Sequence, residues 1–142
     1  MPTRSAEATW DGQLRNGEGH LKLGSGAFEG PFSFETRFEN GSGANPEELL
    51  GAAHAGCYSM ALSRLLGEAG HTPEHIDTLA NVHLDQTGDG FAISRISLAT
   101  EARVPGVDED EFRRIANDAK NQCLVSQIIQ GPEIELEAQL RS

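Results

Sequence analysis

The chain has 142 residues and a net charge of −11, from 11 basic and 22 acidic side chains. This length predicts a single domain over residues 1–142, and the negative field repels nucleic acid and anionic lipid, so we expect neither as a partner. Residues 1–11 lack the apolar segment of a secretory signal, and the most apolar stretch, residues 49–62, is too short to span a bilayer. We therefore expect a cytoplasmic protein.

The first 40 residues are punctuated by glycines, which predicts short strands, here over residues 6–10 and 20–23. Three phenylalanines then recur at even spacing, Phe32, Phe34 and Phe38, with polar side chains on the opposite parity. This alternation predicts a half-buried strand with one aromatic face.

A long helix is predicted over residues 46–69. Asn45 is a candidate N-cap, Glu48 stands at the third helical position, and Gly70 follows the last turn as a C-cap glycine. Residues 49–62 are small or apolar on almost every side of this helix, a pattern typical of a central, buried helix.

The second half of the chain alternates strand and helix patterns. Following the strands and the long helix, this order predicts an α+β fold. The predicted elements are a hairpin with strands at 77–85 and 91–104, an amphipathic helix over 108–121, a short helical turn over 125–130 and a last strand over 133–140.

The two cysteines, Cys57 and Cys123, lie 66 positions apart and form no metal-binding pattern. A reducing cytosol disfavours a permanent disulfide between them. Taken alone, Cys57 in an apolar helix fits a small buried hydrophobe. Cys123 lies between two helical segments, where a helix N-terminus favours a thiolate, although a plain boundary cysteine fits equally.

The other polar candidates have simple structural explanations when considered singly. Glu47 complements the dipole of the long helix, and Arg37 is by default a solvated charge. His71 and His75 are four residues apart, but Pro73 between them argues against a helix that presents both to one metal. We expect no metal site and interpret all five histidines as ordinary surface residues.

Together these residues resemble a known family. The run NPEELLGAAHAGCYSMAL over residues 45–62 is similar to the signature helix of the OsmC/Ohr family of organic hydroperoxide reductases. The segments 36–38 and 123–126 match the family as well. The similarity covers essentially the whole chain, including residues 67–70, 104–106 and 139–142, and it is closer to the OsmC branch than to the Ohr branch.

The resemblance implies a peroxidatic Cys57, a resolving Cys123, and Arg37 with Glu47 as the charged pair that organises the site. It also implies antiparallel sheets packed around the long helix in an intertwined homodimer, no cofactor, a dihydrolipoamide-type dithiol as reductant, and a role in oxidative and osmotic stress. One position departs from the family pattern, since Leu124 stands where proline often follows the second cysteine.

The chemistry constrains how these groups act. A thiolate attacks the peroxide, so Cys57 needs a nearby cation, for which Arg37 is the candidate and Glu47 its anchor. Ten helical residues, about 15 Å, separate Glu47 from Cys57. Either a partner subunit supplies the charged pair or Arg37 spans much of this distance. We expect a homodimer with composite sites, and an apolar pocket that favours bulky organic hydroperoxides.

Two other functions remain open from sequence. The chain fits a non-catalytic module that senses oxidants through its thiols or binds an apolar ligand, and it fits a structural stress protein whose cysteines are inert. Sustained turnover distinguishes an enzyme from both. Phosphate-binding loops, serine-hydrolase elbows and dinucleotide-binding glycine motifs are missing from the sequence, which argues against those enzyme classes.

Overall fold

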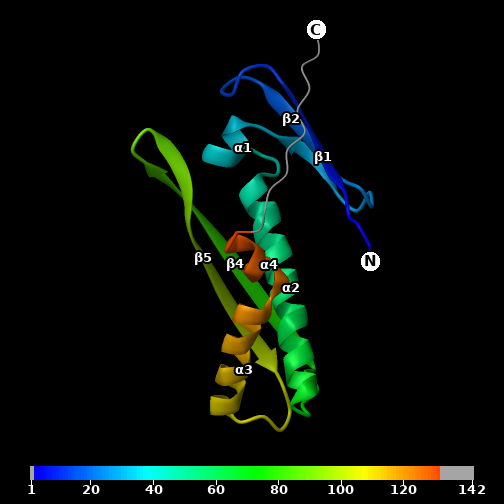
Figure 1. Cartoon of the computed structure of the whole chain (residues 1–142). Helices are drawn as coiled ribbons and strands as arrows, with labels where there is room; N and C mark the ends of the chain where they lie inside the picture. Colours follow the sequence, from blue (N-terminus) through cyan, green and yellow to red (C-terminus); the bar gives the residue numbers. More distant parts are fainter. Residues whose placement is uncertain (1, 132–142) are drawn as a thin grey trace. The chain divides into compact units, whose positions relative to one another are not determined.

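Nine helices and strands follow one another in the computed structural model, which describes residues 2–131 (Figure 1). The order confirms the predicted α+β class. The expected last strand over 133–140 and the family match at 139–142 lie outside the described residues. The elements are β1 (Ala6–Asp11), β2 (Glu18–Leu23), β3 (Glu29–Phe32), α1 (Phe34–Phe38), α2 (Pro46–Glu68), β4 (His75–Thr87), β5 (Gly90–Arg103), α3 (Glu109–Gln122) and α4 (Leu124–Ile129).

The described chain forms two compact units. Unit 1 comprises residues 2–52 and 81–96, and unit 2 comprises residues 53–80 and 97–131. The long helix α2 and the β4–β5 hairpin each contribute to both units. Each unit is described by itself below.

A three-stranded antiparallel sheet, in the order β1–β2–β3, forms the base of unit 1. The two strands predicted from glycine punctuation are confirmed, with β1 and β2 pairing Ala6 against Leu23. Trp10 and Phe32 pack with ring centroids 5.4 Å apart. This contact needs Gly19, because a Cβ there would collide with the Phe32 ring and lie 2.7 Å from the Trp10 ring.

The predicted aromatic strand is only partly correct. The strand ends at Phe32, and Ser33 caps the short helix α1. The Ser33 N–H donates to Thr36 Oγ1 at 2.8 Å, while Ser33 Oγ accepts from the Thr36 N–H at 3.3 Å, which is a capping box. Phe34 and Phe38 then stack one turn apart, with centroids separated by 4.9 Å. Because Phe34 and Phe38 are four residues apart, they lie on the same face of either a strand or a helix. The hydrogen bonds of the Ser33 cap favour the helix.

Helix α2 begins and ends as the capping residues predict. At its start, the side-chain oxygen of Asn45 accepts a hydrogen bond of 2.7 Å from a backbone N–H of the first turn. At its end, Gly70 adopts a φ of +87°, which allows the N–H of His71 to reach the carbonyl oxygen of Leu66 at 2.9 Å.

The core of unit 2 lies between α2 and the pair α3 and α4. The helix predicted over 108–121 is confirmed as α3, with Asp108 as its N-cap, and it runs beside the second half of α2 (Figure 1). Tyr58 donates a hydrogen bond of 2.9 Å from its hydroxyl to the carbonyl oxygen of Ala116, which fixes α2 against α3. The buried core residues are Tyr58, Leu62, Leu66, Ile115, Ala119 and Cys123.

The β4–β5 hairpin matches the predicted one, although β4 is longer than expected and β5 begins and ends one residue earlier. Gly88 in the turn has a φ of +57°, a conformation that glycine adopts without strain. In unit 2, Ser59 of α2 donates to Thr78 Oγ1 of β4 at 2.8 Å, so a half-buried hydroxyl pair joins helix and hairpin. None of the helices within residues 2–131 combines the length and the apolar character that crossing a bilayer requires.

Candidate active site

The two cysteines meet in unit 2. Cys57 lies midway along α2 and is half-buried, whereas Cys123 is completely buried at the junction of α3 and α4; both are free thiols. Cys57 packs against the core cluster that contains Cys123, and its thiol is one of the groups that lower the pKa of Cys123. The structure therefore brings together the two residues that the sequence separates by 66 positions, in the reduced state.

Cys123 occupies the N-cap position of α4, where free backbone N–H groups converge. Burial by itself would raise the pKa of the Cys123 thiol. Hydrogen bonds from the Ser126 N–H, the Cys57 thiol, the Ser126 hydroxyl and the Val125 N–H outweigh that effect, so the pKa of Cys123 lies below its ordinary value. Leu124, which replaces the family's proline, is the first residue of α4 and is largely exposed.

His54 was expected at the surface, and this expectation is wrong. Only 5% of His54 is exposed, and its Nε2 lies 2.9 Å from Ser126 Oγ. Its Nδ1 is buried and has no hydrogen-bond partner within residues 2–131. Burial lowers the pKa of His54 from 6.5, so the ring is neutral near pH 7. The available sequence signal was its position four residues before the core residue Tyr58, on the same helix face.

The second charged feature lies in unit 1, where α1 faces the first turn of α2. Arg37 Nη2 and Nε lie 2.8 and 3.0 Å from Glu47 Oε1, and Nε lies 3.3 Å from Oε2. Glu47 is buried, whereas 39% of the Arg37 side chain is exposed. Asn45 Nδ2 donates to the carbonyl oxygen of Thr36 at 3.1 Å, which holds the two helices together. The predicted pairing of Arg37 with Glu47 is therefore observed, and its role in chemistry stays a prediction.

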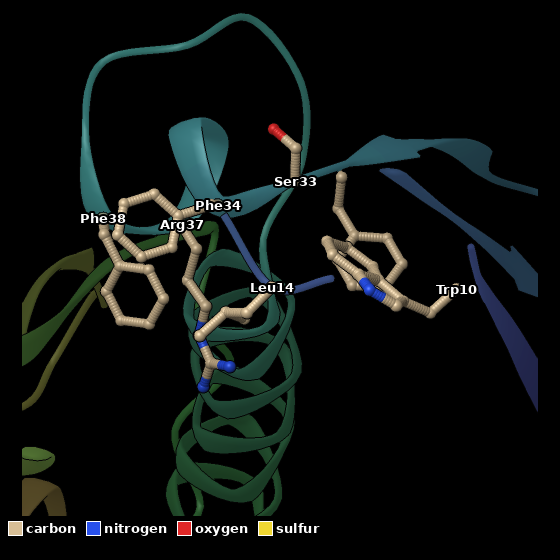
Figure 2. Close-up of a pocket in the computed structure, with 7 residues that line it drawn as sticks. Trp10, Leu14, Ser33, Phe34, Arg37 and Phe38 are labelled. Atoms are coloured by element: carbon tan, nitrogen blue, oxygen red, sulfur yellow. The ribbon is translucent and has the colours of Figure 1, made fainter. Parts of the chain in front are cut away.

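An apolar pocket of about 320 Å³ opens beside this ion pair, on the same unit (Figure 2). The Arg37 guanidinium lies 5.3 Å from the centroid of the Phe38 ring at one wall. The predicted aromatic set thus lines a pocket, although from a strand and a helix rather than from one strand. The pocket is lined by Trp10, Leu14, Phe32, Ser33, Phe34, Arg37 and Phe38.

Two free thiols brought together in an α+β fold are the groups that dithiol redox chemistry uses. The sequence model described as OsmC-like protein matches residues 39–137, and the chain belongs to this family. The resemblance inferred from the signature helix is thereby confirmed.

Similar proteins agree with this assignment. The chain is 49% identical to peroxiredoxin OsmC of Escherichia coli strain K12 over 140 residues, which cover 98% of this chain and 97% of the relative. A crystal structure of an organic hydroperoxide resistance protein from Elizabethkingia anophelis has a TM-score of 0.70 and 26% identity, covering 92% of this chain and 90% of that one. An OsmC protein from Legionella pneumophila, 23% identical over 89% of this chain and 90% of its own, shares the fold with a TM-score of 0.65. The Escherichia coli and Elizabethkingia anophelis relatives support a peroxide-related redox function.

Proposed function

We propose that the protein is a peroxidase that reduces organic hydroperoxides to alcohols, with Cys57 as the attacking thiol and Cys123 as the resolving one. The observation that carries the proposal is that Cys57 packs against the core cluster that contains Cys123, with its thiol close enough to lower the pKa of the second thiol. A sulfenic acid formed on Cys57 would have its partner thiol already in contact. Such contact favours rapid disulfide formation over further oxidation.

The order of attack follows from access. Cys123 is completely buried, whereas Cys57 is half-buried, and a hydroperoxide from solvent therefore meets Cys57 first.

The reaction balances in three steps. The Cys57 thiolate attacks a peroxide oxygen, the O–O bond breaks, and the departing alkoxide takes a proton to leave as the alcohol. Cys123 attacks the resulting sulfenic sulfur, so that an S–S bond forms, the S–O bond breaks and water leaves. An external dithiol then reduces the disulfide by exchange. A dihydrolipoamide-type dithiol is proposed on the family resemblance alone.

The pocket of unit 1 supports an organic substrate. Its walls are largely aromatic and aliphatic, and Arg37 supplies the cation at its rim. An apolar substituent gains free energy from entering such a pocket, about 25 cal/mol per Å² of apolar surface removed from water. Hydrogen peroxide has no such surface. We therefore propose that Arg37, held by Glu47, orients the hydroperoxide group while the pocket binds the organic part.

We further propose an intertwined homodimer with composite sites. An intact α2 keeps Glu47 about 15 Å along the helix axis from Cys57, so the charged pair acts either from a second copy or through the reach of Arg37. Exposed apolar side chains on unit 2 favour the second copy: Met60 is 76% exposed, and Leu79, Leu124 and Ile128 are each more than half exposed. A monomer with full activity would contradict this part of the proposal.

The test is turnover of cumene hydroperoxide with excess dihydrolipoamide. We expect many turnovers per chain for the native protein and a complete loss in Cys57→Ser. Ser59→Ala is the matched control, because it removes a hydroxyl from the same helix that bonds to Ala55 and Thr78 rather than to a thiol. Cys123→Ser should consume about one equivalent and then stall as the sulfenic acid.

Two results would overturn the enzyme assignment. Consumption of one equivalent by the native chain, followed by no further reaction, would favour an oxidant sensor. Activity that survives Cys57→Ser would leave the aromatic pocket as the remaining functional feature and would favour a module that binds an apolar ligand.

A further inference from the structure

A buried chain of hydrogen bonds links both thiols of unit 2 to His54. Cys57 donates to Cys123, the Ser126 hydroxyl also donates to Cys123, and His54 Nε2 lies 2.9 Å from Ser126 Oγ. Cys123 is completely buried and His54 nearly so. The proposed reaction uses the two cysteines, but it assigns no task to Ser126 or His54.

The buried position of Cys123 raises a question about its proton. When Cys123 attacks a sulfenic acid it must lose the thiol proton, and its sulfur has no exposed surface through which water could accept it. A serine hydroxyl both donates and accepts a hydrogen bond. The Ser126 hydroxyl donates to Cys123 when that sulfur is ionised. When Cys123 carries its proton, the hydroxyl can rotate toward His54 Nε2, take the proton of Cys123 and pass its own proton to the ring.

His54 is suited to accept this proton for a short time only. A neutral imidazole has one nitrogen that accepts a hydrogen bond, and burial keeps the pKa of His54 low, so the ring is neutral before the step. Within residues 2–131 no carboxylate or carbonyl partners its Nδ1, so nothing there stabilises a lasting imidazolium. The proton therefore returns readily.

Tyr58 is a further titratable group near Cys123 within residues 2–131, and the structure excludes it as the acceptor. Its hydroxyl is committed as a donor to the carbonyl oxygen of Ala116. Burial, and secondly the charge of Cys123, raise the pKa of Tyr58, which keeps its own proton in place. His54 is thus the base that the hydrogen bonds of Cys123 reach.

We propose that Ser126 is a catalytic residue of the resolving step and that His54 is the positioning residue that acts through it, accepting the proton that Cys123 gives up. This proposal rests on the proposed function. As Cys123 attacks the Cys57 sulfenic acid, its proton moves to Ser126 Oγ and the Ser126 proton moves to His54 Nε2. The S–S bond forms, the S–O bond breaks, and the departing hydroxide takes up the proton that His54 held and leaves as water.

A single-turnover experiment separates the two chemical steps. The reduced full-length chain is mixed with one equivalent of cumene hydroperoxide and quenched in acid at intervals. Mass spectrometry then distinguishes the sulfenic acid, one oxygen heavier, from the disulfide, two hydrogens lighter. We expect Ser126→Ala and His54→Gln to form the sulfenic acid at the native rate and to convert it to the disulfide roughly 10²-fold more slowly, a general acid–base effect.

Conservative and matched variants exclude a merely structural effect. Ser126→Thr keeps the hydroxyl and should resolve within about threefold of the native rate. His54→Gln keeps a hydrogen-bonding group near Ser126 but accepts no proton. His71→Gln removes a histidine of the same unit whose Nε2 bonds to Glu111, and Ser59→Ala removes a hydroxyl that faces Thr78; both should be native in both steps.

A second arm works without any hydroperoxide. With 5,5′-dithiobis(2-nitrobenzoate), Cys57 releases one thionitrobenzoate, and Cys123 releases a second when it resolves the mixed disulfide, which requires the same loss of its proton. If the native chain formed no sulfenic acid, the peroxidase would be refuted. The relay would still stand if the second phase were slower in His54→Gln than in the native chain. Native rates of resolution in His54→Gln and Ser126→Ala, or equal slowing of both steps, would overturn the relay.

Discussion

The ion pair between Arg37 and Glu47 allows a quantitative test of how unit 1 is held together. Replacing Arg37 with methionine removes all three guanidinium contacts, at 2.8, 3.0 and 3.3 Å, and leaves the buried carboxylate of Glu47 without its charge partner. Removing one partner of a fully buried pair costs about 3–5 kcal/mol, whereas exposed pairs contribute about 0.2–1 kcal/mol. Because 39% of the Arg37 side chain is exposed, we expect an intermediate loss of about 2 kcal/mol in the free energy of unfolding.

A double-mutant cycle isolates the pair. Arg37→Met, Glu47→Gln and the double variant are compared by urea unfolding at one protein concentration, since an assembly would make stability depend on concentration. Glu47→Gln should cost less than Arg37→Met, because it leaves the charge on the more exposed partner. We expect a coupling energy of about 1–2 kcal/mol between the two sites.

Arg113 and Glu109 provide the matched control, since they form an ion pair of the same 2.8 Å length with both side chains about three-quarters exposed. The same substitution there, Arg113→Met, should cost no more than about 0.5 kcal/mol. Equal costs for Arg37→Met and Arg113→Met, or strictly additive effects in the cycle, would refute the argument that burial of Glu47 makes the pair strong.

Three further outcomes are expected in unit 2. Leu62→Ala, at a site with no exposed surface, should lower the free energy of unfolding by about 2–5 kcal/mol in urea titrations, and a loss below about 1 kcal/mol would contradict the core assignment. Tyr58→Phe should cost about 1 kcal/mol through the lost bond to Ala116, and an unchanged denaturation midpoint would show that this bond contributes nothing. Because burial lowers the pKa of His54, the unfolded chain binds more protons below about pH 6.5, so stability should fall with decreasing pH there. His54→Gln should flatten that fall by up to about 1.4 kcal/mol per pH unit, and parallel pH profiles would count against the buried neutral ring.

The elements with local signals could be predicted from sequence. The Asn45 cap and Gly70 define the ends of α2 through hydrogen bonds made within a few residues, and the amphipathic period of α3 reports its buried side directly. The segment from Phe32 to Phe38 shows the limit of such patterns. Its even spacing fits a strand and a helix alike, and only the bonds between Ser33 and Thr36 decide between them.

The candidate site, like the fold, could be predicted from the sequence only in part. The residue types of the site, two cysteines with an arginine and a glutamate, could be predicted from the signature helix and the segments that resemble the family on either side of it. The pocket was expected as an aromatic face, but Trp10 and Leu14 join it from a distant part of the chain. Contacts between residues far apart in sequence depend on packing, which no local period encodes.

His54 and Ser126 illustrate what the sequence alone left undecided. By itself the sequence determined the α+β order, the boundaries of α2 and the identity of the two thiols, because caps, periods and residue chemistry act locally. Small and apolar residues surround His54 on every side of α2, so no amphipathic stripe marks which face is buried. Only the docking of α3 and α4 against α2 selects that face, buries the imidazole, and places its Nε2 against a hydroxyl 72 residues away.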